Sequence, residues 1–263
     1  MKHALLRTWR ALVSRWYLVL LVVAIDIAFL YFFGRTYAGI FQQISTHLNT
    51  INALLQQSIG TFAQSNDATA LELGMAQFNA EVAFVESTIL QVIAYLAGYW
   101  LVCEGIAWYF VYRIADVKTR VVDFAWRFAL ATVAGLALFV GWISLIVWLS
   151  VKTFSSPVPL IGQSELNLIA AIGGLVLAYL LLVAYSVLEK GFWKKFSRAA
   201  FKRITTTGLA YVLGLVVLFV LAKLLGVIFA TRNILLAFAF AVIILLPAMT
   251  ALRVFLIEII KEN

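Results

Sequence analysis

Charged residues, cysteine and histidine are all scarce in this chain of 263 residues. Only 12% of its residues are Asp, Glu, Lys or Arg and 64% are hydrophobic, whereas a soluble domain has about 25% charged residues. This composition excludes an ordinary water-soluble domain. The single cysteine, Cys103, excludes a disulfide within the chain. The two histidines, His3 and His47, cannot form a histidine metal cluster, so we expect neither a metal nor a cofactor.

The motifs of the common enzyme classes are missing as well. The sequence contains no P-loop, no GxGxxG after a strand, no GxSxG and no HExxH. Cys103 lies in an apolar run without a histidine nearby, which is typical of a buried structural thiol. We therefore expect that the protein is not an enzyme.

Long hydrophobic runs dominate what is present. Each of six runs has about 20 residues or slightly more, the length that crosses a hydrocarbon core of about 30 Å as a helix. The sequence therefore predicts an all-α integral membrane bundle of six transmembrane helices. The predicted spans are residues 16–34, 89–112, 128–151, 166–188, 208–230 and 233–257, the last of them kinked near Pro247.

The formal net charge of +8 is unevenly distributed between the connections. Most Lys and Arg residues lie before the first span, after the last span, or in the connections 113–127 and 189–206. The connections on the other side hold only Arg35, Lys152 and Arg232. Because cytoplasmic loops carry the excess of Lys and Arg, we expect a cell-membrane protein with both termini in the cytoplasm.

One long segment between the first two spans is not membrane-like. Its apolar residues recur at spacings of four and three, as in the a and d positions of a coiled coil. In the second half of the segment they are Leu71, Met75, Phe78, Val82, Val85, Ile89 and Val92, and in the first half Phe41, Ile44, Leu48, Ile51, Leu55, Ile59 and Phe62. The pattern predicts an antiparallel coiled-coil hairpin outside the cell, between spans 1 and 2.

The polar run 63–68 predicts the tip of this hairpin, and Ser65, Asn66 and Asp67 are the candidate interaction residues. In this pairing Phe62 faces Leu71, Leu55 faces Phe78, and Ile44 faces Ile89. The alternative is a folded external loop without a binding role. The predicted domains are residues 1–34 with the basic N-terminal segment and span 1, the external hairpin 35–88, and residues 89–263 with five further spans.

Four ionisable residues lie inside the predicted spans: Asp26, Glu104, Lys223 and Arg253. Charges at membrane depth are costly and usually face the interior of a bundle. Distances from the predicted span ends place Asp26 and Lys223 at one depth, and Glu104 within reach of Arg253 in the other half of the bilayer. We therefore expect two ion pairs, Asp26–Lys223 and Glu104–Arg253. They either fix which spans are neighbours or form a polar path for transport.

The connection 190–206 predicts an amphipathic helix on the lipid surface. Its apolar face holds Phe192, Trp193, Phe196, Ala200 and Ile204, and its basic residues are Lys194, Lys195, Arg198, Lys202 and Arg203. Such a helix lies in the headgroup plane, with its cations drawn to anionic lipid. A nucleic acid would bind the same cations, but aromatic rings directed at the bilayer leave little to stack on bases. We therefore expect anionic lipid headgroups as partners and no nucleic acid.

Two functions follow from these patterns. The first is a non-enzymatic membrane scaffold or interaction protein whose hairpin binds an external protein or a second copy of the chain. The alternative is a transporter or lipid-handling protein that uses Asp26, Lys223 and Glu104. Spans with few Gly or Pro interruptions favour the first function, since transport routes usually contain broken helices.

Overall fold

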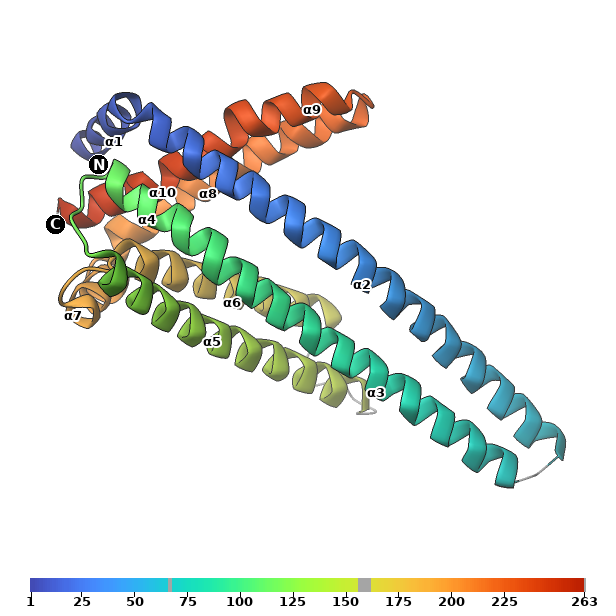
Figure 1. Cartoon of the computed structure of the whole chain (residues 1–263). Coiled ribbons are helices and arrows are strands. Elements are labelled where there is room, and N and C mark those ends of the chain that lie inside the picture. The colour runs from blue at the N-terminus through green and yellow to red at the C-terminus, as the bar shows by residue number, and fades with distance from the viewer. Residues whose placement is uncertain (66–67, 156–161, 263) are drawn as a thin grey trace. The chain divides into compact units, whose positions relative to one another are not determined.

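The computed structural model describes residues 1–65, 68–155 and 162–262, and all regular structure in these ranges is helical (Figure 1). Most elements are α-helices, and three segments, η1 to η3, have the wider π-helical turn. In chain order the elements are α1 (Lys2–Ser14), α2 (Trp16–Ser65), α3 (Ala68–Tyr99), η1 (Trp100–Glu104), α4 (Gly105–Ile114), α5 (Val121–Ser155), α6 (Gln163–Ser186), α7 (Phe192–Ser197), η2 (Arg198–Lys202), α8 (Ile204–Ala230), α9 (Ile234–Phe240), η3 (Ala241–Leu245) and α10 (Leu246–Lys261).

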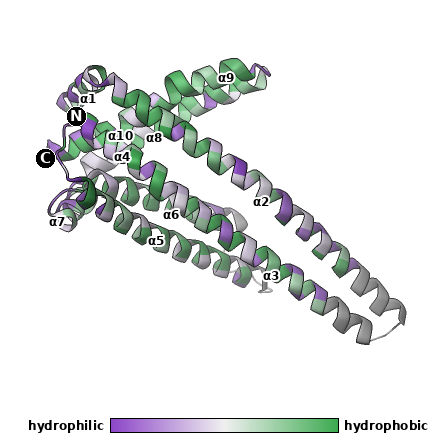
Figure 2. Ribbon diagram, in the orientation of Figure 1, coloured by the Kyte–Doolittle hydropathy of each residue, from purple (hydrophilic) through white to green (hydrophobic). Residues whose placement is uncertain are grey.

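The described residues contain six helices that are long and apolar enough to cross a membrane. They are Trp16–Leu54, Ala76–Ile114, Val121–Lys152, Ser164–Ser186, Ile204–Ala230 and Ile234–Lys261. Hydrophobic residues colour α5, α8 and α9 over most of their length (Figure 2), and large apolar side chains of α8 such as Val216 and Phe219 are exposed. Surfaces of this kind face lipid in a membrane bundle. The predicted number of spans and the multi-pass class are therefore confirmed.

Local sequence explains where several helices end. The chain leaves α4 at Asp116 and α8 at Arg232, both with positive φ angles of 56° and 58°. Aspartate tolerates this left-handed conformation better than most residues. Asn233 then caps α9 by accepting a hydrogen bond of 3.0 Å from the N–H of Leu236. Gly191, with φ of 78°, supplies the left-handed residue before α7.

The chain forms two compact units, and the first comprises Met1–Asp26 and Glu104–Asn263. Helix α10 is its central element, because it packs against α1, α4, α6 and α8. The buried residues of α10 include an uninterrupted run from Arg253 to Ile259. Continuous burial of this kind is typical of a helix that is covered on all sides. Figure 1 shows both chain termini beside the C-terminal end of α10.

Helices α5 and α6 pack closely, and a small residue allows this approach. A Cβ atom at Gly173 would lie 2.0 Å from the ring of Trp142. A Cβ atom at the neighbouring Gly174 would meet nothing within 4 Å. Only the first of these two glycines is therefore required by packing.

The second unit comprises Ile27–Cys103 and contains most of α2 together with α3. Its two helices run antiparallel. The rings of Phe32 and Tyr99 lie 6.4 Å apart, and those of His47 and Phe84 lie 3.8 Å apart. From Phe32 to His47 the chain advances 15 residues along α2, while their partners on α3 go back 15 residues, from Tyr99 to Phe84. His47 also contacts the carboxylate of Glu81.

The described positions of the predicted coiled-coil seam differ in burial. Ile51 is buried, whereas Phe41, Leu48 and Ile89 are exposed. The other described positions are half-buried: Ile44, Phe78, Val82, Val85 and Val92. This pattern does not establish a coiled coil, which stays a prediction. The contacts between α2 and α3 that the structure does show come from aromatic and polar side chains instead, among them a hydrogen bond of 3.1 Å between Thr36 and Tyr99. No break separates the first predicted span from the hairpin, because α2 is one continuous helix of 50 residues.

Candidate functional site

Three charged side chains form a buried cluster in the first unit, which we call the charged triad: Asp26, Glu104 and Arg253. The guanidinium of Arg253 donates from Nη1 to the Asp26 carboxylate at 3.2 and 3.3 Å. Its Nη2 donates to the Glu104 carboxylate at 3.0 and 3.1 Å. The three residues are only 4–7% exposed. A single arginine fork therefore binds both carboxylates away from solvent.

The triad confirms one predicted ion pair and corrects the other. Arg253 contacts Glu104, as expected, but Asp26 also contacts Arg253 and not Lys223. The expected depth of Asp26 was wrong because it was measured from a helix end near residue 34, where α2 does not end. Counted from Trp16, Asp26 lies about 15 Å along its helix, and Glu104 lies about 15 Å from Ile114. Both carboxylates thus reach the same depth.

Lys223 lies elsewhere. Its side chain is exposed on α8, and its Nζ lies 5.4 Å from the centre of the Phe219 ring. Among the charged contacts in the described part of the chain, none joins Lys223 to a carboxylate. A lysine near a lipid-facing surface can extend its amine toward the headgroups. Lys223 is therefore not part of the triad.

The sequence analysis did not predict the aromatic residue that contacts the triad. The guanidinium of Arg253 lies 5.8 Å from the ring centre of Trp108, a cation–π distance. Trp108 follows Glu104 by four residues and so lies on the same helix face. The ring of Trp108 is buried and lies 5.5 Å from that of Tyr185 on α6. This i to i+4 spacing of Glu and Trp was the signal in the sequence that could have identified the contact.

The triad carries two acidic groups and one basic group. With all three ionised it has one negative charge in excess, which is costly to bury. A bound proton or a small cation would balance this charge. Glu104 is also the last residue of the π-helical segment η1, and η3 precedes the helix that carries Arg253. Such segments are frequent at functional sites because they change the direction of the side chains that follow.

The basic segments predicted for one side of the membrane meet at one end of the first unit, here called the basic end. Arg7 of α1 bonds Glu258 of α10 at 3.2 Å and Glu262, just after α10, at 2.8 Å. Arg15 bonds Asp116 at 2.9 Å. These contacts bring the N-terminal segment, the connection after α4 and the C-terminal helix together. These three segments therefore lie together at one end of the first unit, and their side of the membrane stays a prediction.

Asp116 at the basic end has a shifted pKa. Its carboxylate is exposed and accepts a hydrogen bond from Arg15. This bond, and the nearby positive charge of the same guanidinium, lower the pKa of Asp116 from its ordinary value of 3.8.

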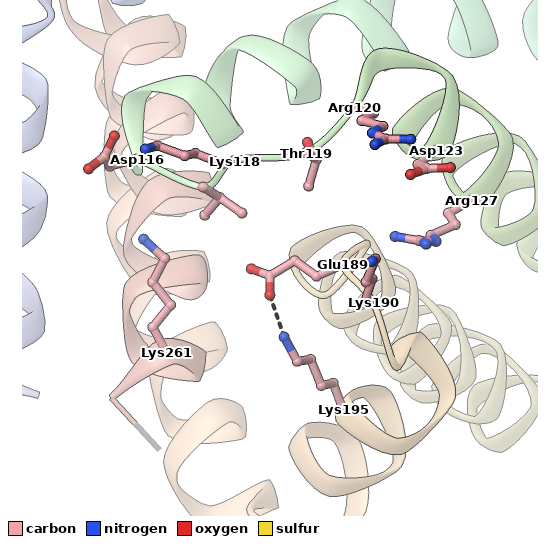
Figure 3. A pocket seen from close by; sticks show the side chains of 11 residues that line it. Asp116, Lys118, Thr119, Arg120, Asp123, Arg127, Glu189, Lys190, Lys195 and Lys261 are labelled. Carbon is pink, nitrogen blue, oxygen red and sulfur yellow. Dashed lines mark hydrogen bonds and ion pairs between the residues drawn. The ribbon is translucent and has the colours of Figure 1, made fainter.

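A hollow of about 610 Å³ opens between the connections of the basic end (Figure 3). Side chains converge on it from the α4–α5 connection, the start of α5, the α6–α7 region and the end of α10. Six cations and three acids line it: Lys118, Arg120, Arg127, Lys190, Lys195, Lys261, Asp116, Asp123 and Glu189. Glu189 contacts Lys195 across its lower part. The excess of cations favours an anionic ligand.

A second hollow, of about 300 Å³, shares Glu189, Lys195 and Lys261 with the first. Its other charged residues are Arg198 and Arg203, and apolar side chains such as Ile257 complete its lining. We call it the Arg203 cleft. The Glu189–Lys195 ion pair lies where the two hollows adjoin.

The predicted lipid-surface helix is shorter and less uniform than expected. It consists of α7 and η2, and its apolar residues split between two environments. Phe192 and Phe196 pack against a buried cluster that includes Ala200 and, on α6, Tyr179. Trp193, in contrast, is 67% exposed. Phe192 and Trp193 are neighbours on α7, so their side chains point in directions about 100° apart.

The basic residues of this segment also divide. Lys194, Arg198 and Lys202 are exposed, whereas Arg203 is half-buried in the cleft and Lys195 contacts Glu189. The predicted tip residues of the hairpin cannot be placed in the same way. Asn66 and Asp67 lie outside the described residues, and Ser65 ends α2.

In the described ranges no three His, Cys, Asp or Glu side chains come together as metal ligands. None of the hollows described above is lined by a member of the charged triad. Comparisons of the chain with protein families, with curated proteins and with solved structures found no match.

Proposed function

We propose that this polytopic membrane protein is a non-enzymatic scaffold or interaction protein of the cell membrane that binds a partner through its α2–α3 hairpin outside the cell. The observation that carries this proposal is helix length. Helix α2 has 50 residues and extends about 75 Å, more than twice the hydrocarbon thickness of a bilayer. The helix formed by α3, η1 and α4 runs from Ala68 to Ile114 and is nearly as long. Helix α8, with 27 residues, matches the bilayer instead.

The surface of the hairpin supports an interaction role. Residues 36–92 contain four acidic residues and no Lys or Arg, although the whole chain has a net charge of +8. Exposed glutamines such as Gln43 and Gln77 offer hydrogen bonds without charge repulsion. A neutral or basic protein surface fits this composition, whereas the hairpin of a second copy would bring its own four acidic residues. The basic end supports contact with anionic headgroups at the cytoplasmic face.

Photo-crosslinking in intact cells tests the proposal. A photoreactive residue at Gln43 or Gln77 should give a discrete crosslinked protein band, and the same residue at the lipid-exposed Val216 should give none. A band at twice the protomer mass of 29.3 kDa would identify a second copy. Any other band would be identified by mass spectrometry. If neither hairpin position crosslinks to protein, the interaction role is wrong.

The charged triad favours a second candidate function, proton- or cation-coupled transport. The specific observation is its one excess negative charge, which a transported ion could balance. In proteoliposomes with an imposed membrane potential, a pH-sensitive dye would report proton flux. We expect Asp26→Asn and Glu104→Gln to abolish that flux if the triad carries it. A wild-type protein that passes neither protons nor alkali cations would exclude this candidate.

A further inference from the structure

The Arg203 cleft contains more positive charge than the protein itself neutralises. Four cations line it against one acid, Glu189. Two of these cations already have partners, because Lys195 contacts Glu189, and Lys261 bonds Glu258 at 2.9 Å. Arg198 and Arg203 remain, with no carboxylate bonded to either of them in the described part of the chain.

Arg203 is the residue that most clearly lacks a partner. Its Nη1 atom is buried, yet it donates to no acceptor in the described residues. A buried donor without an acceptor costs about 1–3 kcal/mol, and more when the group is charged. Arg203 occupies the junction between η2 and α8, where its backbone carbonyl accepts the N–H groups of Thr206 and Thr207. These backbone bonds hold Arg203 in place at the lining of the cleft.

The start of α8 adds to the attraction for an anion. This helix of 27 residues begins at Ile204 without a side-chain cap. The N-terminus of a helix carries a partial positive charge, and its first N–H groups lack intrahelical acceptors. Thr207, in the first turn of α8, lines the cleft beside Arg203. The helix N-terminus therefore acts together with the two arginines and is not the sole attraction.

We propose that the Arg203 cleft binds a phosphate group, with Arg203 and Arg198 as its principal ligands. A guanidinium matches the paired oxygens of phosphate in geometry and charge. The volume of about 300 Å³ admits a phosphate group with part of the molecule attached to it. The apolar lining from Ile257 and Ile260 suits the attached part when that part is the glycerol end of a lipid. A phospholipid headgroup and a soluble phosphate compound share this chemistry. The cleft is independent of the hairpin and of the interaction role proposed for it.

Native mass spectrometry of the full chain in detergent tests this site. The protein is titrated with phosphatidylglycerol, with phosphatidylcholine and with inorganic phosphate. We expect saturable binding of one phosphatidylglycerol, and Arg203→Gln should weaken it about tenfold, the loss of one charge-assisted hydrogen bond. The matched control is Lys202→Gln. Lys202 is the neighbouring residue, is exposed and lines neither hollow, so its loss should change the affinity by less than about twofold.

Competition between the probes distinguishes the sources of the ligand. Displacement of the lipid by millimolar inorganic phosphate would indicate a soluble phosphate compound, and lipid binding that resists phosphate would indicate a headgroup. If Arg203→Gln does not fold, Arg198→Gln is tested in its place, because Arg198 is exposed and lines the same cleft. The proposal is overturned if the wild type binds neither phosphatidylglycerol nor inorganic phosphate saturably. It is also overturned if Lys202→Gln weakens binding as much as the variants of the cleft.

Discussion

Replacement of Arg253 by methionine is the most informative perturbation of the bundle. Arg253→Met keeps a long apolar side chain but removes the only cation of the charged triad. Asp26 and Glu104 would then share a buried site without a partner for either carboxylate. In the wild type their four contacts with the guanidinium span 3.0–3.3 Å. All four would be lost at once.

The expected cost follows from the charge count. Removal of one partner from a buried ion pair destabilises a protein by about 3–5 kcal/mol. Asp26→Asn leaves a balanced pair of Arg253 and Glu104, so we expect a smaller loss of about 1–3 kcal/mol. The triple variant Asp26→Asn, Glu104→Gln, Arg253→Met has no charge left to bury. Its stability should be much closer to wild type than that of Arg253→Met alone.

The assay is reversible unfolding in mixed micelles, followed by intrinsic tryptophan fluorescence, with the free energy of unfolding compared between variants. Lys223→Met is the control, because it also removes one cation from a predicted span. Since Lys223 is exposed, lies over the Phe219 ring and pairs with no carboxylate in the described part of the chain, we expect a change of at most about 1 kcal/mol.

Two results would refute this reasoning. The first is a triple variant no more stable than Arg253→Met, which would show that the unpaired charge is not the cause of the loss. The second is an equal loss for Asp26→Asn and Arg253→Met, because the two variants leave different net charges in the site.

Three further predictions concern packing, hydrogen bonding and pH. Gly173→Ala should lower the free energy of unfolding by about 1–3 kcal/mol through steric overlap, whereas Gly174→Ala should leave it unchanged or raise it by up to about 1 kcal/mol. Tyr112→Phe should cost about 1–3 kcal/mol in the same assay, because the buried hydroxyl accepts one backbone hydrogen bond and donates another. Arg15 lowers the pKa of Asp116 in the folded state. Their contact should therefore stabilise the folded protein above pH 3.8, and this stabilisation should disappear as the pH falls through the lowered pKa. Unfolding midpoints measured in acid should therefore depend less on pH in Asp116→Asn.

Properties that depend on composition along the chain could be predicted from the sequence. The number of spans was predictable, because hydropathy over about 20 residues decides whether a helix can cross a membrane. The meeting of the basic segments at one end of the first unit followed from their distribution between the connections. The Glu104–Arg253 contact followed from depth, because α4 and α10 end within four residues of the predicted span ends 112 and 257.

Properties that depend on rotation and helix continuity could not be predicted in this way. The depth of Asp26 was misjudged because nothing in the hydropathy near residue 34 distinguishes the end of a helix from its continuation as α2. The three π-helical segments of the described chain rotate the side chains that follow them, and neither hydropathy nor spacing indicates where a wider turn will form. The apolar face expected around Phe192 and Trp193 is divided between protein and surroundings, because neighbouring residues of a helix point about 100° apart.

The position of the charged triad has a topological consequence. Asp26 is the last residue of the first unit before the second unit, which contains the hairpin, and Glu104 is the first residue after it. One guanidinium therefore acts as a non-covalent cross-link that closes residues 27–103 into a loop. An insertion with tethered ends can change in length or surface without disturbing its host. Removal of seven residues from each arm, about two helical turns, would shorten the arms by about 10 Å and leave the cross-link intact. The hairpin is thus suited to evolve, or to be exchanged by design, independently of the membrane bundle.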